Sequence, residues 1–210
     1  MPIYMKPGDW VRAYEEGVPH WAEDRTPSPL AEQFLKMFDN GSGNKILEIG
    51  VGNGRDSIYF ATKGNNVTGI DIVGSAIDLA IKNAELTGLA DKLDLRVGNA
   101  EKLEFGDSSF DGVYSVSVLH ATDLDLSLKE IARVLKNGGK AMIYLYEKTE
   151  SKGKEYWFTE RKKVEELLRN NDLVVEDKWD IPHTGHEREK TTVLIYRLTK
   201  DTGAFERENG

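Results

Sequence analysis

The chain has 210 residues, of which 39% are hydrophobic and 30% are charged, a composition typical of one globular domain. Its 28 basic and 36 acidic residues give a net charge of −8, which argues against broad binding to nucleic acids or anionic membranes. Cysteine is absent, so disulfides, a thiolate nucleophile and cysteine-bound metals are excluded. No apolar run approaches the ~18 residues of a membrane span, and Met1–Trp10 lacks a signal-peptide profile. We therefore expect a cytoplasmic protein.

Residues 1–40 are predicted to form a helical segment ahead of the main fold. Residues 1–26 are polar and rich in aromatic side chains, and Pro27 and Pro29 introduce apolar residues at helical spacing. We hypothesise that part of this segment is a lid over the acceptor pocket, formed by Trp10, Tyr14, His20 and Trp21. The alternative is that these side chains pack on the outer face of the sheet.

The middle of the chain alternates between short apolar segments and amphipathic ones. Strands are predicted at Lys45–Ile49, Val67–Asp71, Leu93–Val97, Phe110–Val116 and Lys140–Tyr146. Helices are predicted at Arg55–Lys63, Ser75–Thr87, Leu126–Leu135 and Thr159–Arg169, the last with Thr159 as its cap. The run Asn137–Gly139 is predicted to be a turn. This alternation indicates βαβ units and an α/β fold, in which a parallel sheet is covered by helices on both faces.

Two further strands are predicted near the end of the chain. Leu173–Trp179 and Thr191–Leu198 are joined by the polar loop Asp180–Lys190, which favours an antiparallel pair. The expected fold is a doubly wound, mostly parallel, seven-stranded sheet with an antiparallel C-terminal strand. We expect one domain over residues 1–200, with a cofactor-binding core at 45–146 and a C-terminal helix and strand pair at 159–200. Residues 201–210 are expected to be a flexible tail.

The segment from Lys45 to Arg55 carries the clearest functional signal. An apolar strand runs into Gly50, Gly52 and Gly54, and a second strand ends at Asp71. Glycines allow a backbone to approach a ligand closely, and an acid at the tip of the neighbouring strand can hold a ribose diol. The alternative is a tight turn without a ligand. The pattern favours a nucleoside-containing cofactor at the carboxyl ends of the strands.

The glycine spacing argues against a nicotinamide cofactor. The dinucleotide fingerprint is G-x-G-x-x-G, whose third glycine allows close packing beneath a pyrophosphate. Counted from Gly50, that position is Arg55, and counted from Gly52 it is Ser57. A nicotinamide-dependent oxidoreductase is therefore disfavoured.

Four segments resemble the motifs of class I S-adenosylmethionine-dependent methyltransferases, in the order and spacing of that family. They are Glu48–Gly54 for the first motif, Gly98–Phe105 for the third, Phe110–Ser115 for the fourth and Val134–Lys140 for the turn before the fifth strand. The resemblance covers about residues 45–146 and implies a Rossmann-like fold with S-adenosyl-L-methionine as the cofactor. Asn99 and Glu104 stand where the third motif usually has Asp and Pro, and Asn137 replaces a Pro in the turn.

The resemblance also implies which residues hold the cofactor. Asp71 matches the acid that binds the ribose hydroxyls, and Asn99 the residue that binds the adenine amine. Glu48 is expected to favour the cationic end of the methionine moiety or to stabilise the following helix N-terminus, and Arg55 to face its carboxylate or solvent. The full expected set is Glu48, Gly50, Gly52, Gly54, Arg55, Asp71, Ile72, Asn99, Ala100 and Ser115.

Within the family, Gly52–Ser57 followed by Tyr59–Ala61 is similar to the small-molecule branch, of methyltransferase type 11/12, that includes tellurite-resistance and thiopurine methyltransferases. This likeness implies in-line methyl transfer to a small nucleophile, such as a thiol, an amine or a metalloid oxyanion. The sequence leaves the acceptor and the oligomeric state open.

Candidates for a general base are few. His120 follows the fourth motif and is the candidate catalytic residue, although a structural histidine at a helix start is the alternative. Tyr144 and Tyr146 end the fifth predicted strand, where core packing is the usual role. His183 and His186 lie in a polar loop near acidic residues, and we interpret them as solvated, so no metal site is predicted.

Two other functions remain open from the sequence alone. An RNA or protein methyltransferase is the first, but the segment Asp111–Tyr114 lacks the two prolines of amino-group nucleic-acid enzymes, and the net charge is −8. A non-catalytic, cofactor-binding subunit is the second. The motifs favour a methyltransferase for a small molecule over both.

Overall fold

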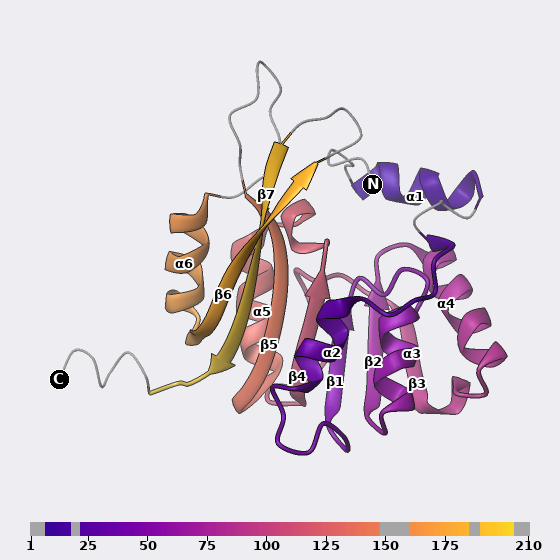
Figure 1. Ribbon diagram of the computed structural model, residues 1–210, viewed down its shortest axis with the longest axis horizontal. Helices are drawn as coiled ribbons and strands as arrows, with labels where there is room; N and C mark the ends of the chain where they lie inside the picture. Colours follow the sequence, from indigo (N-terminus) through magenta and orange to yellow (C-terminus); the bar gives the residue numbers. More distant parts are fainter. Residues whose placement is uncertain (1–6, 18–21, 148–159, 185–189, 204–210) are drawn as a thin grey trace.

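The computed structural model describes residues 7–17, 22–147, 160–184 and 190–203, which build one seven-stranded sheet (Figure 1). Its strands stand in the order β3-β2-β1-β4-β5-β7-β6. They are β1 (Lys45–Ile49), β2 (Asn66–Asp71), β3 (Leu93–Val97), β4 (Phe110–Val116), β5 (Leu135–Glu147), β6 (Leu173–Thr184) and β7 (Lys190–Lys200). Strands β1 to β5 pair in parallel, and β7 runs antiparallel to both β5 and β6. The predicted Rossmann-like fold is confirmed.

Helices cover both faces of the sheet. They are α1 (Pro7–Glu15), α2 (Pro29–Leu35), α3 (Arg55–Thr62), α4 (Gly74–Leu86), α5 (Leu124–Val134) and α6 (Arg161–Asn170), with short 3-10 turns at Ala90–Lys92 (η2) and Leu119–Ala121 (η3). Figure 1 shows α1 above the carboxyl ends of the parallel strands, close to α4. The chain leaves β1 toward β2 and reaches β4 on the other side, so a crevice opens at the carboxyl ends of these strands.

The strand β1 contributes side chains to two hydrophobic clusters, one on each face of the sheet. Ile46 faces a cluster with α2 and α3, whereas Leu47 and Ile49 face a cluster with α5 and α6. Successive side chains of a strand point to opposite faces, so a strand covered on both sides is apolar throughout. This double burial anchors β1, and with it the glycine segment that follows.

An aromatic group holds α2 and α3 against the sheet. The ring of Phe34 lies 5.5 Å from that of Phe60 and 5.3 Å from that of Tyr114, measured between centroids. Gly112 leaves room for these rings, because an added Cβ would lie 2.6 Å from Phe38 Cζ and 2.8 Å from Phe34 Cζ. The fit positions α3 directly behind the glycine segment.

The predictions for the turn before β5 and for the start of α5 are wrong. Asn137–Gly139 is not a turn ahead of the strand, because β5 already begins at Leu135. Phe110 pairs with Leu135 and Gly112 with Lys140, so the residues between them form an irregularity within the strand, in which Gly138 has a φ of 78°. Helix α5 starts at Leu124 rather than Leu126, because the Asp123 side chain accepts the N–H groups of its first turn.

The C-terminal elements also differ from the expectation. The predicted loop Asp180–Lys190 is partly strand, since β6 extends to Thr184 and β7 begins at Lys190. Helix α6 starts at Arg161 after Glu160, and Thr159 lies outside the described residues. The start of the predicted tail is held in place, because the Asp201 N–H donates to the Asp172 carbonyl at 3.0 Å. Residues 204–210 lie outside the described part.

We predict that Phe34→Ala lowers the free energy of unfolding by about 3–5 kcal/mol, because it leaves a cavity between three rings in a fully buried site. Urea denaturation followed by circular dichroism measures the change. Leu126→Ala is the control, because Leu126 is 46% exposed and should change the value by about 0.5 kcal/mol or less. Equal stabilities for the two variants would contradict the packing described above.

Candidate functional site

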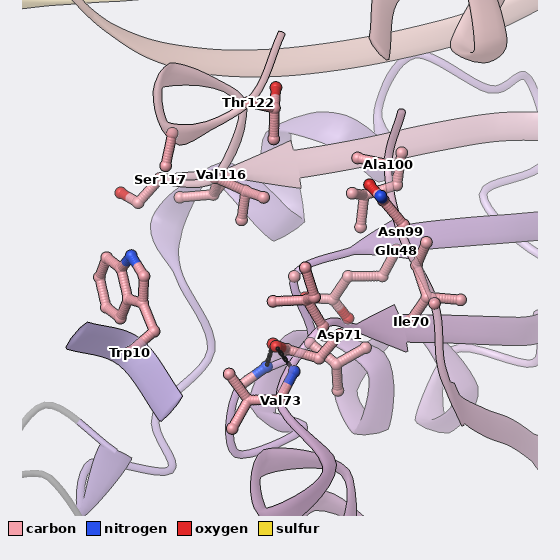
Figure 2. A pocket seen from close by; sticks show the side chains of 18 of the residues that line it. Trp10, Glu48, Ile70, Asp71, Val73, Asn99, Ala100, Val116, Ser117 and Thr122 are labelled. Atoms are coloured by element: carbon pink, nitrogen blue, oxygen red, sulfur yellow. Dashed lines mark hydrogen bonds between the residues drawn. The ribbon is translucent and has the colours of Figure 1, made fainter. Parts of the chain in front are cut away.

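A cavity of about 510 Å³ opens at the carboxyl ends of the parallel strands (Figure 2). It is formed by the segments that follow β1, β2, β3 and β4, with α1 along one side. Its lining residues are Trp10, Tyr14, Ala22, Glu48, Ile49, Gly50, Val51, Gly52, Asn53, Arg55, Asp56, Ile70, Asp71, Ile72, Val73, Gly98, Asn99, Ala100, Glu101, Val116, Ser117, Val118, Ala121 and Thr122. The cavity therefore gathers most of the expected cofactor-binding residues.

The three glycines after β1 are needed at their positions for different structural reasons. Gly50 and Gly52 line the cavity with φ angles of 84° and 56°, values that residues with a Cβ rarely adopt. A Cβ on Gly50 would lie 2.0 Å from Val118 Cγ2, so the loop after β4 packs directly against the Gly50 backbone. Gly54 is not among the lining residues. Its φ is 83°, it precedes α3, and a Cβ there would lie 3.0 Å from Ala80 Cβ.

Asp71 at the end of β2 fixes the shape of the glycine segment. Its carboxylate accepts the N–H of Gly52 and the N–H of Val73, each at 3.0 Å (Figure 2). Burial raises the pKa of Asp71, and these backbone donors oppose the rise. A carboxylate has about four lone-pair sites, so two bonds leave capacity for a diol in the cavity.

Two buried acids lie beneath the glycine segment. The Glu48 carboxylate accepts the hydroxyl hydrogen of Ser57, and burial, followed by repulsion from Asp56, raises the pKa of Glu48 well above its usual value. Asp56 accepts the N–H of Ser28 at 2.6 Å and the Tyr114 hydroxyl at 3.2 Å, and its pKa is also raised by burial. A cation in the cavity would favour the ionised forms of both acids.

Arg55 is the cationic side chain among the lining residues. Its Nε lies 3.8 Å from Asp56 Oδ1, so its charge is partly offset within the site. On the other side, Asn99 Oδ1 accepts the Glu101 N–H at 2.9 Å, and Ala100 and Ile72 line the wall. A carbonyl oxygen has a second lone pair, so Asn99 retains the ability to accept another hydrogen bond.

Ser115 and His120 are not brought to the cavity, contrary to the expectation. Ser115 is fully buried, and its hydroxyl donates to the Ile49 carbonyl at 3.2 Å, so it joins β4 to β1. His120 is 7% exposed, and its ring packs edge-on against Tyr146 at 4.8 Å between centroids. Burial lowers the pKa of His120 to about 4, and its Nδ1 has no hydrogen-bond partner among the described residues. These positions argue against direct catalysis by His120.

The sequence interpretation missed the segment after β4. Val116, Ser117, Val118, Ala121 and Thr122 line one side of the cavity. One signal was available, because these residues end or directly follow a predicted parallel strand, where ligand-binding loops of this fold occur.

The N-terminal segment is tied to the glycine loop. Asn53 Nδ2 donates to the carbonyls of Ala22 and Asp24, at 2.9 and 2.7 Å. Of the four residues expected in a lid, Trp10 and Tyr14 line the cavity, and a Cβ on Gly52 would lie 3.4 Å from the Tyr14 hydroxyl. The other two, His20 and Trp21, lie outside the described residues.

Neither a metal cluster nor a membrane span is found in the described part of the chain. Its His, Asp and Glu side chains include no group of three that could hold a metal ion. His186 lies outside this part, and His183 is described here only as a backbone position in β6. None of the helices in the described ranges is both long and apolar enough to cross a membrane.

Comparison with known proteins shows that the middle of the chain is similar to methyltransferases. Residues 47–143 match the family model described as "Methyltransferase domain". Methyltransferase GfsG of Streptomyces halstedii is 30% identical over 133 residues, which cover 59% of this chain and 48% of that protein. O-methyltransferase rstn1 of Aspergillus nomiae is 30% identical over 145 residues, which cover 68% of this chain and 63% of that protein. The chain thus spans about half to somewhat under two thirds of these relatives.

Among solved structures, a similar one is the geranyl diphosphate C-methyltransferase of Streptomyces coelicolor, in complex with Mg2+, geranyl diphosphate and S-adenosyl-L-homocysteine. The TM-score is 0.70 at 14% identity, and the match covers 81% of this chain and 78% of that one. At this identity the likeness establishes the fold.

We predict that Glu48→Gln changes how stability depends on pH. Because the folded-state pKa of Glu48 is raised above its ordinary 4.5, the folded protein binds an extra proton above pH 4.5, and this stabilisation is lost as pH rises through the folded-state pKa. Glutamine removes that loss, so the variant should gain stability relative to wild type as pH rises, by about 1.4 kcal/mol per unit of pKa shift.

Urea denaturation between pH 5 and pH 8 measures this difference. Glu85→Gln, at an exposed position of α4, is the matched control and should follow the wild-type curve. A constant difference between Glu48→Gln and wild type at all pH values would show that Glu48 does not titrate in this way.

Proposed function

Because residues 47–143 match the model of the methyltransferase domain family, we propose that this chain transfers the methyl group of S-adenosyl-L-methionine to a small-molecule acceptor. One observation carries the proposal. A single cavity joins the glycine segment after β1, Asp71 at the end of β2 and Asn99 after β3. These are the three positions that such a cofactor requires for its methionine, ribose and adenine parts.

The residues present fit the chemistry of this cofactor. Asp71 keeps lone pairs available for two ribose hydroxyls after accepting two backbone N–H groups. Glu48 and Asp56 make the floor of the cavity favourable for the ammonium and sulfonium charges. Asn99 Oδ1 can accept from an adenine amine, and Ile72 and Ala100 offer apolar contact to the base.

When bound, the cofactor supplies an activated methyl group, and the protein aligns the acceptor and excludes water. Gly50 and Gly52 bring the backbone close to the cavity, and Val118, which also lines it, packs against Gly50. Trp10 and Tyr14 of α1 cover one side, which limits access of solvent. The protein's own part is therefore mainly orientation, and His120 does not line the cavity.

A small acceptor is favoured over a nucleic acid or a protein. The net charge of −8 disfavours contact with a phosphate backbone, and the cavity is partly covered by α1. No observation on the described residues favours a non-catalytic role. A cytoplasmic location remains part of this proposal, consistent with the absence of cysteine.

We predict that Asp71→Ala weakens binding of adenosylhomocysteine by about 1–3 kcal/mol, which is about 5- to 150-fold in Kd. The change leaves the ribose hydroxyls and the Gly52 N–H without their common acceptor. Isothermal titration calorimetry measures the affinity, with Asp94→Ala on the exposed part of β3 as the control. Wild-type affinity in Asp71→Ala would remove the ribose assignment.

We predict that deleting residues 1–17 leaves adenosylhomocysteine binding within about threefold and lowers methyl transfer at least tenfold. The deletion removes α1 but keeps Ala22 and Asp24, whose carbonyls hold Asn53. Transfer of labelled methyl groups to a pool of small metabolites measures turnover. Arg12→Ala, at an exposed position of α1, should behave as wild type. Undiminished transfer by the deletion variant would reject the lid.

A further inference from the structure

Among the described residues, four carboxyl side chains line the cavity, and Glu101 is set apart from the other three by its position. Glu48, Asp56 and Asp71 belong to β1, α3 and β2, the elements around the glycine segment. Glu101 comes after β3, two residues beyond Asn99, and its side chain is partly exposed. It therefore brings a carboxylate to the end of the cavity that the proposed function gives to the adenine ring.

The Glu101 side chain bridges the two segments that form this end of the cavity. Its Oε1 accepts the N–H of Asp123 at 2.9 Å, and Asp123 directly follows Thr122, which lines the cavity. On the other side, Glu101 directly follows Asn99 and Ala100, which Figure 2 shows together on one wall. A carboxylate that joins two lining segments lies at the wall between them.

Helix α5 fixes the backbone that carries Glu101. The Glu130 Oε2 atom accepts the Leu103 N–H at 2.7 Å. The Arg133 guanidinium donates to the carbonyls of Leu103 and Phe105, at 2.8 and 2.7 Å. Arg133 also donates to Glu130 at 2.8 Å, so both side chains of α5 are held in place. Because the segment is already fixed, a ligand that binds to it needs little ordering of the chain.

Asn99 and Glu101 both keep acceptor capacity. Asn99 Oδ1 accepts the Glu101 N–H at 2.9 Å, which orients the amide and leaves the oxygen one lone pair. Glu101 Oε1 is bonded to Asp123, whereas Oε2 has no hydrogen-bond partner within the described ranges. Carboxylate oxygens accept stronger hydrogen bonds than a neutral carbonyl. The two residues thus offer one neutral and one charged acceptor close together.

We propose that Glu101 recognises the adenine ring of the cofactor, its Oε2 accepting one hydrogen of the exocyclic amine while Asn99 Oδ1 accepts the other. An amine with two hydrogens matches two acceptors, and the bond to Glu101 is the charge-assisted one. This inference rests on the proposed function, because it requires the cofactor in this cavity. It adds Glu101 to the cofactor-binding residues and makes it a determinant of specificity for the base.

The pair of acceptors discriminates against a base that lacks the amine. Hypoxanthine has an oxygen at that position, so it presents an acceptor where adenine presents two donors. The oxygen would face the Glu101 carboxylate and Asn99 Oδ1, neither of which can donate. Turning the Asn99 amide round to donate would give up its bond to the Glu101 N–H.

The test compares adenosylhomocysteine with S-inosylhomocysteine, which differs from it only in the base, on the full-length protein. We expect isothermal titration calorimetry to show that wild type binds adenosylhomocysteine about tenfold or more tightly than the analogue, because the analogue leaves acceptors unpaired.

Glu101→Gln isolates the contribution of the carboxylate. Glutamine has nearly the same shape, and its carbonyl can still accept the Asp123 N–H, so the two segments stay joined. Its amide nitrogen then replaces Oε2 and can donate to the hypoxanthine oxygen. We expect this variant to bind S-inosylhomocysteine about threefold or more tightly than wild type, and adenosylhomocysteine more weakly by a similar factor. A residue that only joined the two segments would leave both affinities unchanged.

Glu104→Gln is the matched control. It makes the same change of charge three residues further along, but Glu104 is exposed and does not line the cavity, so both affinities should stay at wild-type values.

Three results overturn the inference. They are equal binding of the two compounds by wild type, unchanged affinities in Glu101→Gln, and an equal loss of affinity for both compounds in that variant. In each case, binding of adenosylhomocysteine by wild type leaves the proposed function standing. Failure of wild type to bind adenosylhomocysteine overturns both the inference and the proposed function.

Discussion

The hydrogen bonds of Asp71 to the backbone of Gly52 and Val73 are the interaction on which the site depends. The bond to Gly52 joins the end of β2 to the loop after β1, and the bond to Val73 orients the Asp71 carboxylate locally. The Gly50 and Val51 N–H groups reinforce the connection between β2 and this loop by donating to the Ile70 carbonyl at 2.7 and 3.1 Å. Because all the donors are backbone N–H groups of the loop and of Val73, the loop keeps its shape without bulky side chains of its own.

The electrostatics of the site follow from what lies under that loop. Glu48 and Asp56 are buried acids whose raised pKa values reflect desolvation, and neutral donors rather than lysines satisfy them. A cation that binds beside such a carboxyl group favours its ionised form. The same cavity is also lined by the uncharged side chains of Trp10, Val116 and Ser117, so charged and uncharged groups share it.

Much of the fold was predictable because its signals are local. The strands β1 to β4 and the helices α3 and α4 follow from apolar runs and glycine stops, and the order of motifs indicated the sheet. The start of β5 was not predictable, since Asn137–Gly139 has turn chemistry and lies within the strand only because Leu135 and Lys140, on either side of it, both pair with β4. Ser115 was predicted at the cavity and lies in the core instead. Ser115 pairs with Ile49 of β1, and its hydroxyl donates to the Ile49 carbonyl.

The sequence alone determined the fold class, the glycine segment and the acid at the end of the second strand, because glycine backbone freedom and strand periodicity are properties of neighbouring residues. Only the tertiary structure decided which of these residues meet at the cavity. His120 follows the fourth motif directly, yet it packs against Tyr146 in the interior. Ser117 and Trp10 are 107 positions apart in the chain and line the same cavity. Such contacts depend on how elements pack across the sheet, and no local pattern of residues encodes that packing.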